Sequence, residues 1–187
     1  MKVRNGVVVT SLFMLVLGTF ACSSGGDTAM PVVADTAGDG ASGENPYGAG
    51  LIDPPLPDEP ILTVTTAEKS VTYSLNQLRE LEATSAEVFE PFVLVNTSFT
   101  GVALSVLFNA AGIPDEAKVE TLAINEYVYA NTAESFTESQ GILAYEENGA
   151  DISVDRGGPI RLIFPDGTTL SKNLDAWNWS LEAISVG

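Results

Sequence analysis

The chain has 187 residues, 25 of them acidic and eight basic, and its formal net charge is −17. Such a surface argues against DNA, RNA or anionic lipid headgroups as partners, because phosphate binding needs lysine and arginine. The acidic surface is compatible with cationic ligands, although a role in solubility alone would explain the excess of acidic residues. The chain contains no histidine, which excludes a Ser-His-Asp triad, a Cys-His pair and histidine-ligated zinc, copper or haem.

Residues 1–21 have the pattern of an export signal. Lys2 and Arg4 form the charged start, and no acid occurs in this segment. The apolar run from Val7 to Phe20 is interrupted by few polar residues and is too short to cross a bilayer comfortably. The segment therefore predicts export of the protein.

Cys22 directly follows this segment and is the predicted lipidation site. The small Ala21 precedes it, as lipoprotein processing requires, although Thr19 stands where the motif usually carries leucine. Two or three acyl chains hold a protein stably, because each buried methylene contributes about 0.8 kcal/mol. We therefore expect a cell-envelope lipoprotein, on the periplasmic face of the outer membrane if the organism has two membranes. An ordinary cleaved signal or an uncleaved anchor is the alternative.

Residues 22–60 are predicted to be a flexible tether. From Ser23 onward they are rich in Gly, Ala, Ser, Asp and Pro and have few large apolar residues, so they cannot build a core. Removal of the export signal takes away two basic residues and no acid, so the net charge becomes −19. Once Cys22 is acylated, no thiol remains for a disulfide, a thiolate metal site or a nucleophile. Residues 61–187 have the length of one domain.

The first elements of this domain are strands followed by a short helix. Ile61–Thr65 and Ser70–Tyr73 alternate in polarity and are rich in β-branched residues, which predicts strands. Ser74 can cap a helix over Leu75–Leu81, whose leucines fall on one face. Phe92–Val95 is typical of a buried strand.

A second helix is predicted in the middle of the domain. Gly101 permits a turn before it, the apolar positions of Ala103–Ala111 share one face, and Gly112 is a C-cap. The segments Val119–Ile124 and Glu126–Ala130 that follow are strand-like.

The last third continues the mixture of strands and short helices. Thr132–Gln140 is predicted to be a short polar helix, Ile142–Tyr145 a short apolar segment, and Glu146–Gly149 a solvated turn. Ile160–Phe164 and Leu181–Val186 are predicted strands. Because strands and helices mix without a strict βαβ repeat, we expect an α+β domain.

Motifs along the whole domain resemble those of one family. Residues 142–152, ILAYEENGADI, and 157–165, GGPIRLIFP, resemble the "LAY…NG…L…GGPLRLV.P" signature of the oxidoreductase molybdopterin-binding domain, the core of the sulfite oxidase family. Residues 73–78, 99–107 and 179–186 resemble its other motifs in the same order and spacing. The resemblance implies a sulfite oxidase-like mixed β structure with short helices.

The positions that serve molybdenum in this family differ here. The resemblance places the family's metal-binding cysteine in the segment before the helix at Ala103. Asn96 or Thr97 stands roughly there, and neither is a soft anionic ligand. A family lysine that helps to hold the anionic cofactor corresponds to Asn178. We therefore expect no metal ligands and no catalytic residues, and molybdopterin is suggested by the resemblance alone.

The remaining candidate is a ligand cleft at the former cofactor position. Gly-Gly-Pro allows the backbone to approach a ligand or another chain segment closely. Arg161 could hold a phosphate or carboxylate, or could instead bridge an internal acid such as Asp155 or Asp175. The candidate cleft residues are Asn96, Thr97, Ser98, Gly157, Gly158, Pro159, Arg161 and Asn178.

The sequence thus favours a degenerate family member in the envelope, which binds a small ligand or an envelope protein without ligating molybdenum. One alternative is an oxidoreductase or electron-transfer subunit that holds molybdopterin without a cysteine ligand. Another is a purely structural envelope protein.

Overall fold

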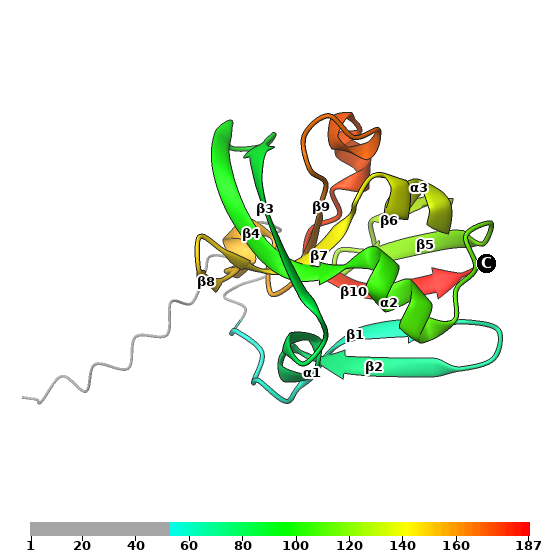
Figure 1. Cartoon of the computed structure of the whole chain (residues 1–187). Coiled ribbons are helices and arrows are strands. Elements are labelled where there is room, and N and C mark those ends of the chain that lie inside the picture. The colour runs from blue at the N-terminus through cyan, green and yellow to red at the C-terminus, as the bar shows by residue number, and fades with distance from the viewer. Residues whose placement is uncertain (1–52) are drawn as a thin grey trace, which may run out of the picture. The chain divides into compact units, whose positions relative to one another are not determined.

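Two five-stranded sheets carry the fold in the computed structural model, which describes residues 53–187 (Figure 1). The first sheet has the strand order β2-β1-β10-β5-β6, in which β1 and β10 are parallel and the other neighbours antiparallel. Its strands are β1 (Pro60–Thr65), β2 (Ser70–Ser74), β5 (Lys118–Ala123), β6 (Val128–Thr132) and β10 (Leu181–Val186).

The second sheet is antiparallel and contains the longest strands. A hairpin of β3 and β4 pairs through β4 with β7, and β7 also pairs with β8 and β9. The strands are β3 (Ala83–Glu90), β4 (Val95–Ala103), β7 (Ile142–Glu147), β8 (Ala150–Asp151) and β9 (Arg161–Ile163).

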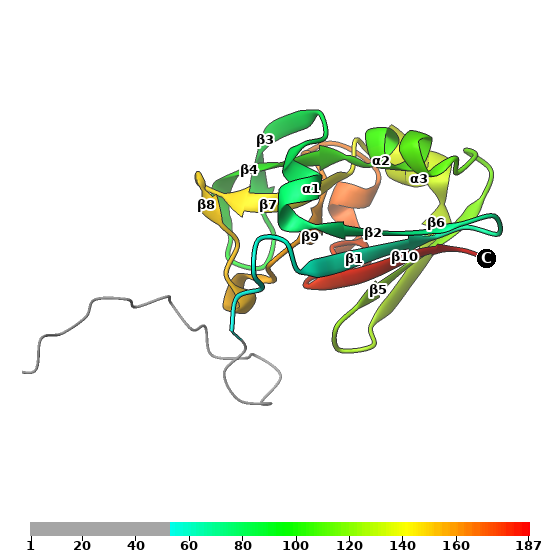
Figure 2. The ribbon, with the colours of Figure 1, turned by 90° about the horizontal axis from the view of Figure 1, so that it is seen from below.

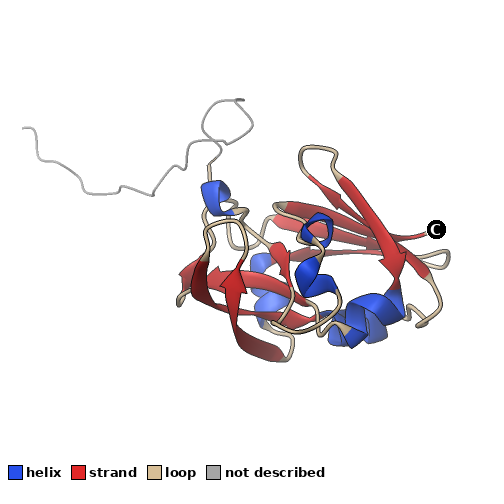
Figure 3. Cartoon of the chain, turned by 90° about the horizontal axis from the view of Figure 1, so that it is seen from above, coloured by secondary structure: helices blue, strands red, loops and turns tan. Residues whose placement is uncertain are grey.

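Three short helices lie on one side of the first sheet (Figure 2). They are α1 (Leu75–Arg79), α2 (Leu104–Ala111) and α3 (Ala133–Glu138), and 3-10 turns occur at Val154–Arg156, Leu170–Lys172 and Leu174–Ala176. Figure 3 shows how small the helical share is beside the strands. This composition confirms the predicted α+β class. None of the helices in residues 53–187 is long and apolar enough to cross a membrane.

The helix ends follow the predicted capping chemistry. Ser74 Oγ accepts a hydrogen bond from the Gln77 backbone N–H, and Gln77 Oε1 accepts one from the Ser74 N–H, which completes a capping box. Gly112 ends α2 in the left-handed conformation, with φ +73°. Thr132 was not predicted as a cap: it is the N-cap of α3 rather than its first residue, and its side chain accepts from the Ser135 N–H. Helix α1 ends at Arg79, two residues earlier than predicted.

The predicted buried strand Phe92–Val95 is wrong. This segment is the exposed turn between β3 and β4 together with the first residue of β4, and Leu94 is 66% exposed. Strand β3 itself was not predicted, because its sequence is polar and only Val88 and Glu90 are buried.

Three other local predictions are corrected by the sheet. Gly101 lies within β4 rather than in a turn, at a register shift where its position is pressed against the β7 backbone. Glu146 and Glu147 belong to β7, and only Asn148 and Gly149 form the turn, both with positive φ. Strand β6 begins at Val128 rather than Glu126, which itself has a positive φ.

Candidate functional site

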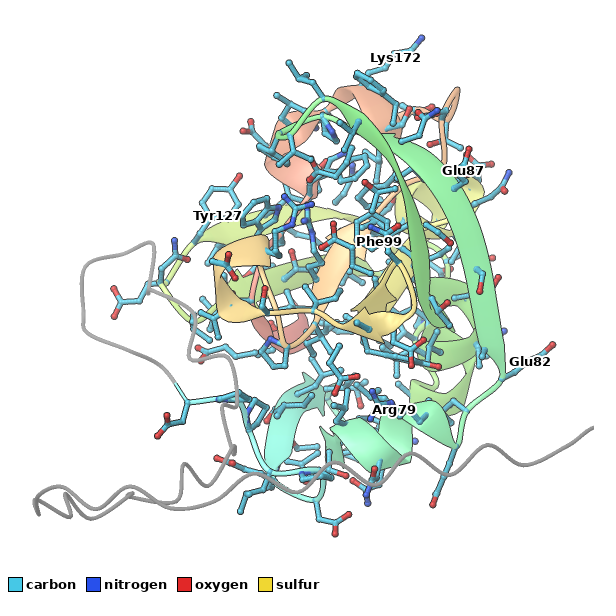
Figure 4. All side chains as sticks on the ribbon, turned by 90° about the vertical axis from the view of Figure 1, so that its left-hand side faces the viewer. Arg79, Glu82, Glu87, Phe99, Tyr127 and Lys172 are labelled. Atoms are coloured by element: carbon cyan, nitrogen blue, oxygen red, sulfur yellow. The ribbon has the colours of Figure 1, made fainter. Side chains whose placement is uncertain are left out.

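A pocket of ≈ 330 Å³ opens where three segments meet. The β3–β4 turn contributes Phe92, the β5–β6 turn contributes Tyr127, and residues 174–179 form the remaining wall. Figure 4 shows Tyr127 at the surface and Phe99 in the interior. The lining residues are Phe92, Ala123, Asn125, Tyr127, Leu174, Asp175, Trp177, Asn178 and Trp179.

Aromatic rings dominate this lining. Phe92 meets Trp179 edge to face, with ring centroids 5.2 Å apart, a favourable arrangement for an aromatic pair. The Tyr127 hydroxyl donates to the Asp175 carbonyl oxygen at 3.0 Å. Burial and the neighbouring Asp175 raise the pKa of Tyr127, so its hydroxyl keeps its proton at neutral pH. The side chains of Phe92, Tyr127 and Leu174 are each at least 40% exposed and form an apolar rim.

Behind the pocket lies a fully buried ion pair. Arg161, from β9, and Glu90, from the end of β3, both have side chains that are 0% exposed. Arg161 Nη2 donates to Glu90 Oε1 at 2.8 Å, and Arg161 Nη1 donates to the Arg156 carbonyl oxygen at 2.9 Å. The sequence left open whether Arg161 holds an anionic ligand or bridges an internal acid. It bridges an internal acid, and that acid is Glu90 rather than Asp155 or Asp175.

Aromatic rings cover the guanidinium of this pair. Arg161 Cζ lies 4.2 Å from the ring centroid of Trp179 and 5.6 Å from that of Phe99, within the range of cation–π attraction. Desolvation lowers the pKa of Arg161 to about 10, and the hydrogen bond to Glu90 opposes that shift. Arg161 therefore stays protonated at neutral pH, with its charge balanced inside the fold.

The second carboxylate oxygen of Glu90 organises the β3–β4 turn. Glu90 Oε2 accepts hydrogen bonds from the backbone N–H groups of Phe92 at 2.8 Å and Val93 at 2.7 Å. The Leu94 N–H donates to the Glu90 carbonyl oxygen at 2.8 Å. Glu90 thereby links the buried arginine to the turn that places Phe92 at the pocket.

Unpartnered polar atoms concentrate beside this pocket. Asn178 Nδ2 donates to the carbonyl and hydroxyl oxygens of Thr121 at 3.1 and 3.2 Å, while Asn178 Oδ1 has no partner among the described residues. The other buried side-chain atoms without a partner in residues 53–187 are Arg161 Nε, Trp177 Nε1, Trp179 Nε1 and Ser180 Oγ. Buried polar groups are normally paired, so these atoms remain available for further hydrogen bonds.

Comparison with known proteins identifies the family. The model of the oxidoreductase molybdopterin binding domain matches residues 55–179. The chain belongs to this family. No curated protein sequence matches the chain.

A solved relative supports the fold of this molybdopterin-binding domain. The chain is similar to the crystal structure of the sulfane dehydrogenase SoxCD from Paracoccus pantotrophus, with a TM-score of 0.56 and 17% sequence identity. The match covers 71% of this chain and 39% of that chain. At this identity the likeness concerns the fold alone.

The structure divides the predicted cleft residues among different places. Asn178 lines the aromatic pocket. Asn96 and Ser98 are on the exposed side of β4, whereas Thr97 between them is buried. Gly158 and Pro159 line a different pocket, which also contains residues 53–56.

Gly157 and Gly158 allow the backbone to lie close to other segments of the same chain. A Cβ at Gly157, which has φ +84°, would lie 2.7 Å from the Trp179 ring. The Ser180 N–H donates to the Gly157 carbonyl oxygen at 2.7 Å. The sequence allowed these glycines to lie close either to a ligand or to another chain segment. In the structure they lie close to another chain segment.

Three residues of the site, Glu90, Phe92 and Tyr127, are not among the candidates that the sequence indicates. Glu90 carries a weak signal, since it is an acid between Phe89 and Pro91 in a locally apolar stretch. Phe92 lies in a segment whose pattern predicts a core strand, and nothing in the sequence around Tyr127 indicates a pocket.

The described residues contain no thiolate that could ligate the molybdenum cofactor of this family. Residues 53–187 contain neither cysteine nor histidine and no cluster of three acidic, cysteine or histidine side chains. The family's lysine position holds Asn178, and the one buried arginine beside the pocket is already paired with Glu90.

Proposed function

We propose that this protein is a lipid-anchored envelope module that has kept the molybdopterin-binding fold and uses the former cofactor region to bind a small ligand without ligating molybdenum. The observation that carries this proposal is the buried Arg161–Glu90 pair. A buried charge must be matched, and this arginine is matched by the protein rather than by an anionic ligand.

The pocket itself has the features of a small-molecule site. It is concave and largely apolar, and a few polar groups of Asn125, Asp175 and Asn178 stand at its walls. Phe92, Tyr127 and Leu174 leave large apolar surfaces exposed at its mouth. A ligand in the pocket would cover these surfaces, and that supports a binding role over a purely structural one.

The metal content of the purified protein tests the central part of this proposal. The full chain, expressed in a host that makes molybdenum cofactor and purified in detergent, should contain far less than one molybdenum atom and one pterin per chain. A known molybdenum enzyme produced in the same host is the control. Stoichiometric molybdenum or pterin would contradict the proposal and favour the alternative, a cofactor-binding oxidoreductase without a cysteine ligand.

Lipidation is a separate prediction, because Cys22 lies outside the described residues. Mass spectrometry of the membrane fraction should find a chain that begins at Cys22 and carries the added mass of two or three acyl chains. The Cys22→Ser variant should lack this mass and keep residues 1–21, since processing requires the modified thiol. An unlipidated wild-type chain cut at another position would show that the signal is an ordinary one.

A further inference from the structure

The chemistry of the aromatic pocket indicates the kind of ligand it takes. Its rings come from three separate segments: Phe92, Tyr127, and the pair Trp177 and Trp179. The faces of such rings carry negative potential and attract cations. Asp175 adds a carboxylate to the wall, and the described residues that line the pocket include no lysine or arginine.

The charge around the pocket also favours a cationic ligand. Arg161 lies against Trp179, at 4.2 Å from its ring centroid, but Glu90 balances its charge within the fold. The whole chain carries a net charge of −17. Beyond the immediate contacts, such an excess of negative charge raises the local concentration of cations and disfavours anions.

The walls also discriminate among cations. A primary ammonium group is strongly hydrated and needs several acceptors to replace its water, but most of the surface that lines the pocket is apolar. A nitrogen bearing alkyl groups needs no hydrogen bonds and is recognised by aromatic side chains. We infer that this pocket binds a small organic cation with an alkylated nitrogen, of the quaternary ammonium class. This inference rests on the proposed ligand-binding function and names its ligand class.

The two tryptophans provide a direct measurement. They are the only tryptophans in the chain, and both line the pocket, so intrinsic fluorescence reports on it specifically. The full chain in an uncharged maltoside detergent would be titrated with choline and, separately, with 3,3-dimethylbutan-1-ol, which has the same shape without the charge. We expect a saturable change with choline and a Kd at least about tenfold lower than that of the neutral isostere.

A pair of phenylalanines supplies matched variants. Phe92 and Phe89 are similarly exposed, at 45% and 47%, but only Phe92 lines the pocket. Phe92→Leu should weaken choline binding about fivefold, whereas Phe89→Leu should leave the Kd within about twofold. Asp175→Asn should also weaken choline binding but leave the weak binding of the neutral isostere unchanged. The melting temperature of each variant checks that the fold is retained.

Different results would contradict the ligand class and the proposed binding function. Equal affinity for choline and its isostere would overturn the inference, while the proposed binding function would stand. The inference would also fail if neither choline nor tetramethylammonium produced a saturable change. Molybdenum in the purified chain, by contrast, would overturn the proposed function itself.

Discussion

Replacing Glu90 by glutamine is expected to lower the free energy of unfolding by about 3–5 kcal/mol, because it leaves Arg161 as a buried charge without a partner. Both side chains are 0% exposed and Arg161 is held by Glu90 Oε1 at 2.8 Å. In a domain of this size the loss corresponds to a fall in melting temperature of roughly 10–20 °C. Thermal and denaturant unfolding of the purified chain would measure it.

Glu87→Gln is the matched control for this change. Glu87 lies on the same strand, β3, but is exposed on the outer side of the hairpin (Figure 4). It should alter stability by no more than about 0.5 kcal/mol. The double variant Glu90→Gln, Arg161→Met should recover part of the loss, because it removes the unpaired charge. A Glu90→Gln protein as stable as Glu87→Gln would show that the pair contributes nothing.

The pH range of this effect follows from Arg161. Burial lowers its pKa in the folded protein to about 10, below the ordinary value of an arginine. Proton-linked stability changes from this group are therefore confined to pH values above about 10, where the folded protein binds fewer protons than the unfolded chain and this contribution to stability rises with pH. Near neutral pH, titration of Arg161 should therefore make no contribution to the pH dependence of the wild-type unfolding free energy.

The second large effect is expected at Gly158. A Cβ there would lie 1.8 Å from the carbonyl oxygen of Ile152 and 2.9 Å from that of Ser153. Both are backbone atoms that cannot rotate away, and the Gly158 N–H donates to the Ser153 oxygen at 2.9 Å. Gly158→Ala must displace this turn, and we expect a loss of about 3 kcal/mol or more in the free energy of unfolding.

Gly167→Ala separates this clash from the general cost of adding a methyl group. Gly167 has a positive φ of +84°, but a Cβ there would meet nothing within 4 Å. Its substitution should cost only about 1–2 kcal/mol, the strain of a left-handed conformation for a residue with a side chain. If urea unfolding found Gly158→Ala no less stable than Gly167→Ala, the close approach to residue 152 would not be a constraint on the fold.

Much of the fold could be predicted because it depends on neighbours in the sequence. The helix α1 follows from Ser74 and Gln77, three residues apart, whose side chains satisfy each other's backbone N–H groups. Gly112 ends α2 because a left-handed residue closes a helix most easily without a side chain. The family could be identified for the same reason, since its motifs are short and keep their order.

The pocket could not be predicted, because its parts meet only after folding. Phe92, Tyr127 and Trp179 come from three segments that are distant in the chain. The apolar run Phe92–Val95 is typical of a buried strand, but Glu90 binds the N–H groups of Phe92 and Val93 and makes the segment a turn. Glu90 lies just before this run and is a weak local signal for the turn, but the apolar pattern of the run outweighs it.

The sequence by itself determined the acidic charge, the absence of histidine and the position of the single cysteine, and these properties exclude whole classes of chemistry without any structure. Local periodicity and capping determined most strands and helices. Only the tertiary structure decided the partner of Arg161, which is Glu90, 71 residues away. The reason is physical: sheet pairing brings the end of β3 and the start of β9 into one desolvated space, where a buried arginine needs a carboxylate whatever its distance along the chain.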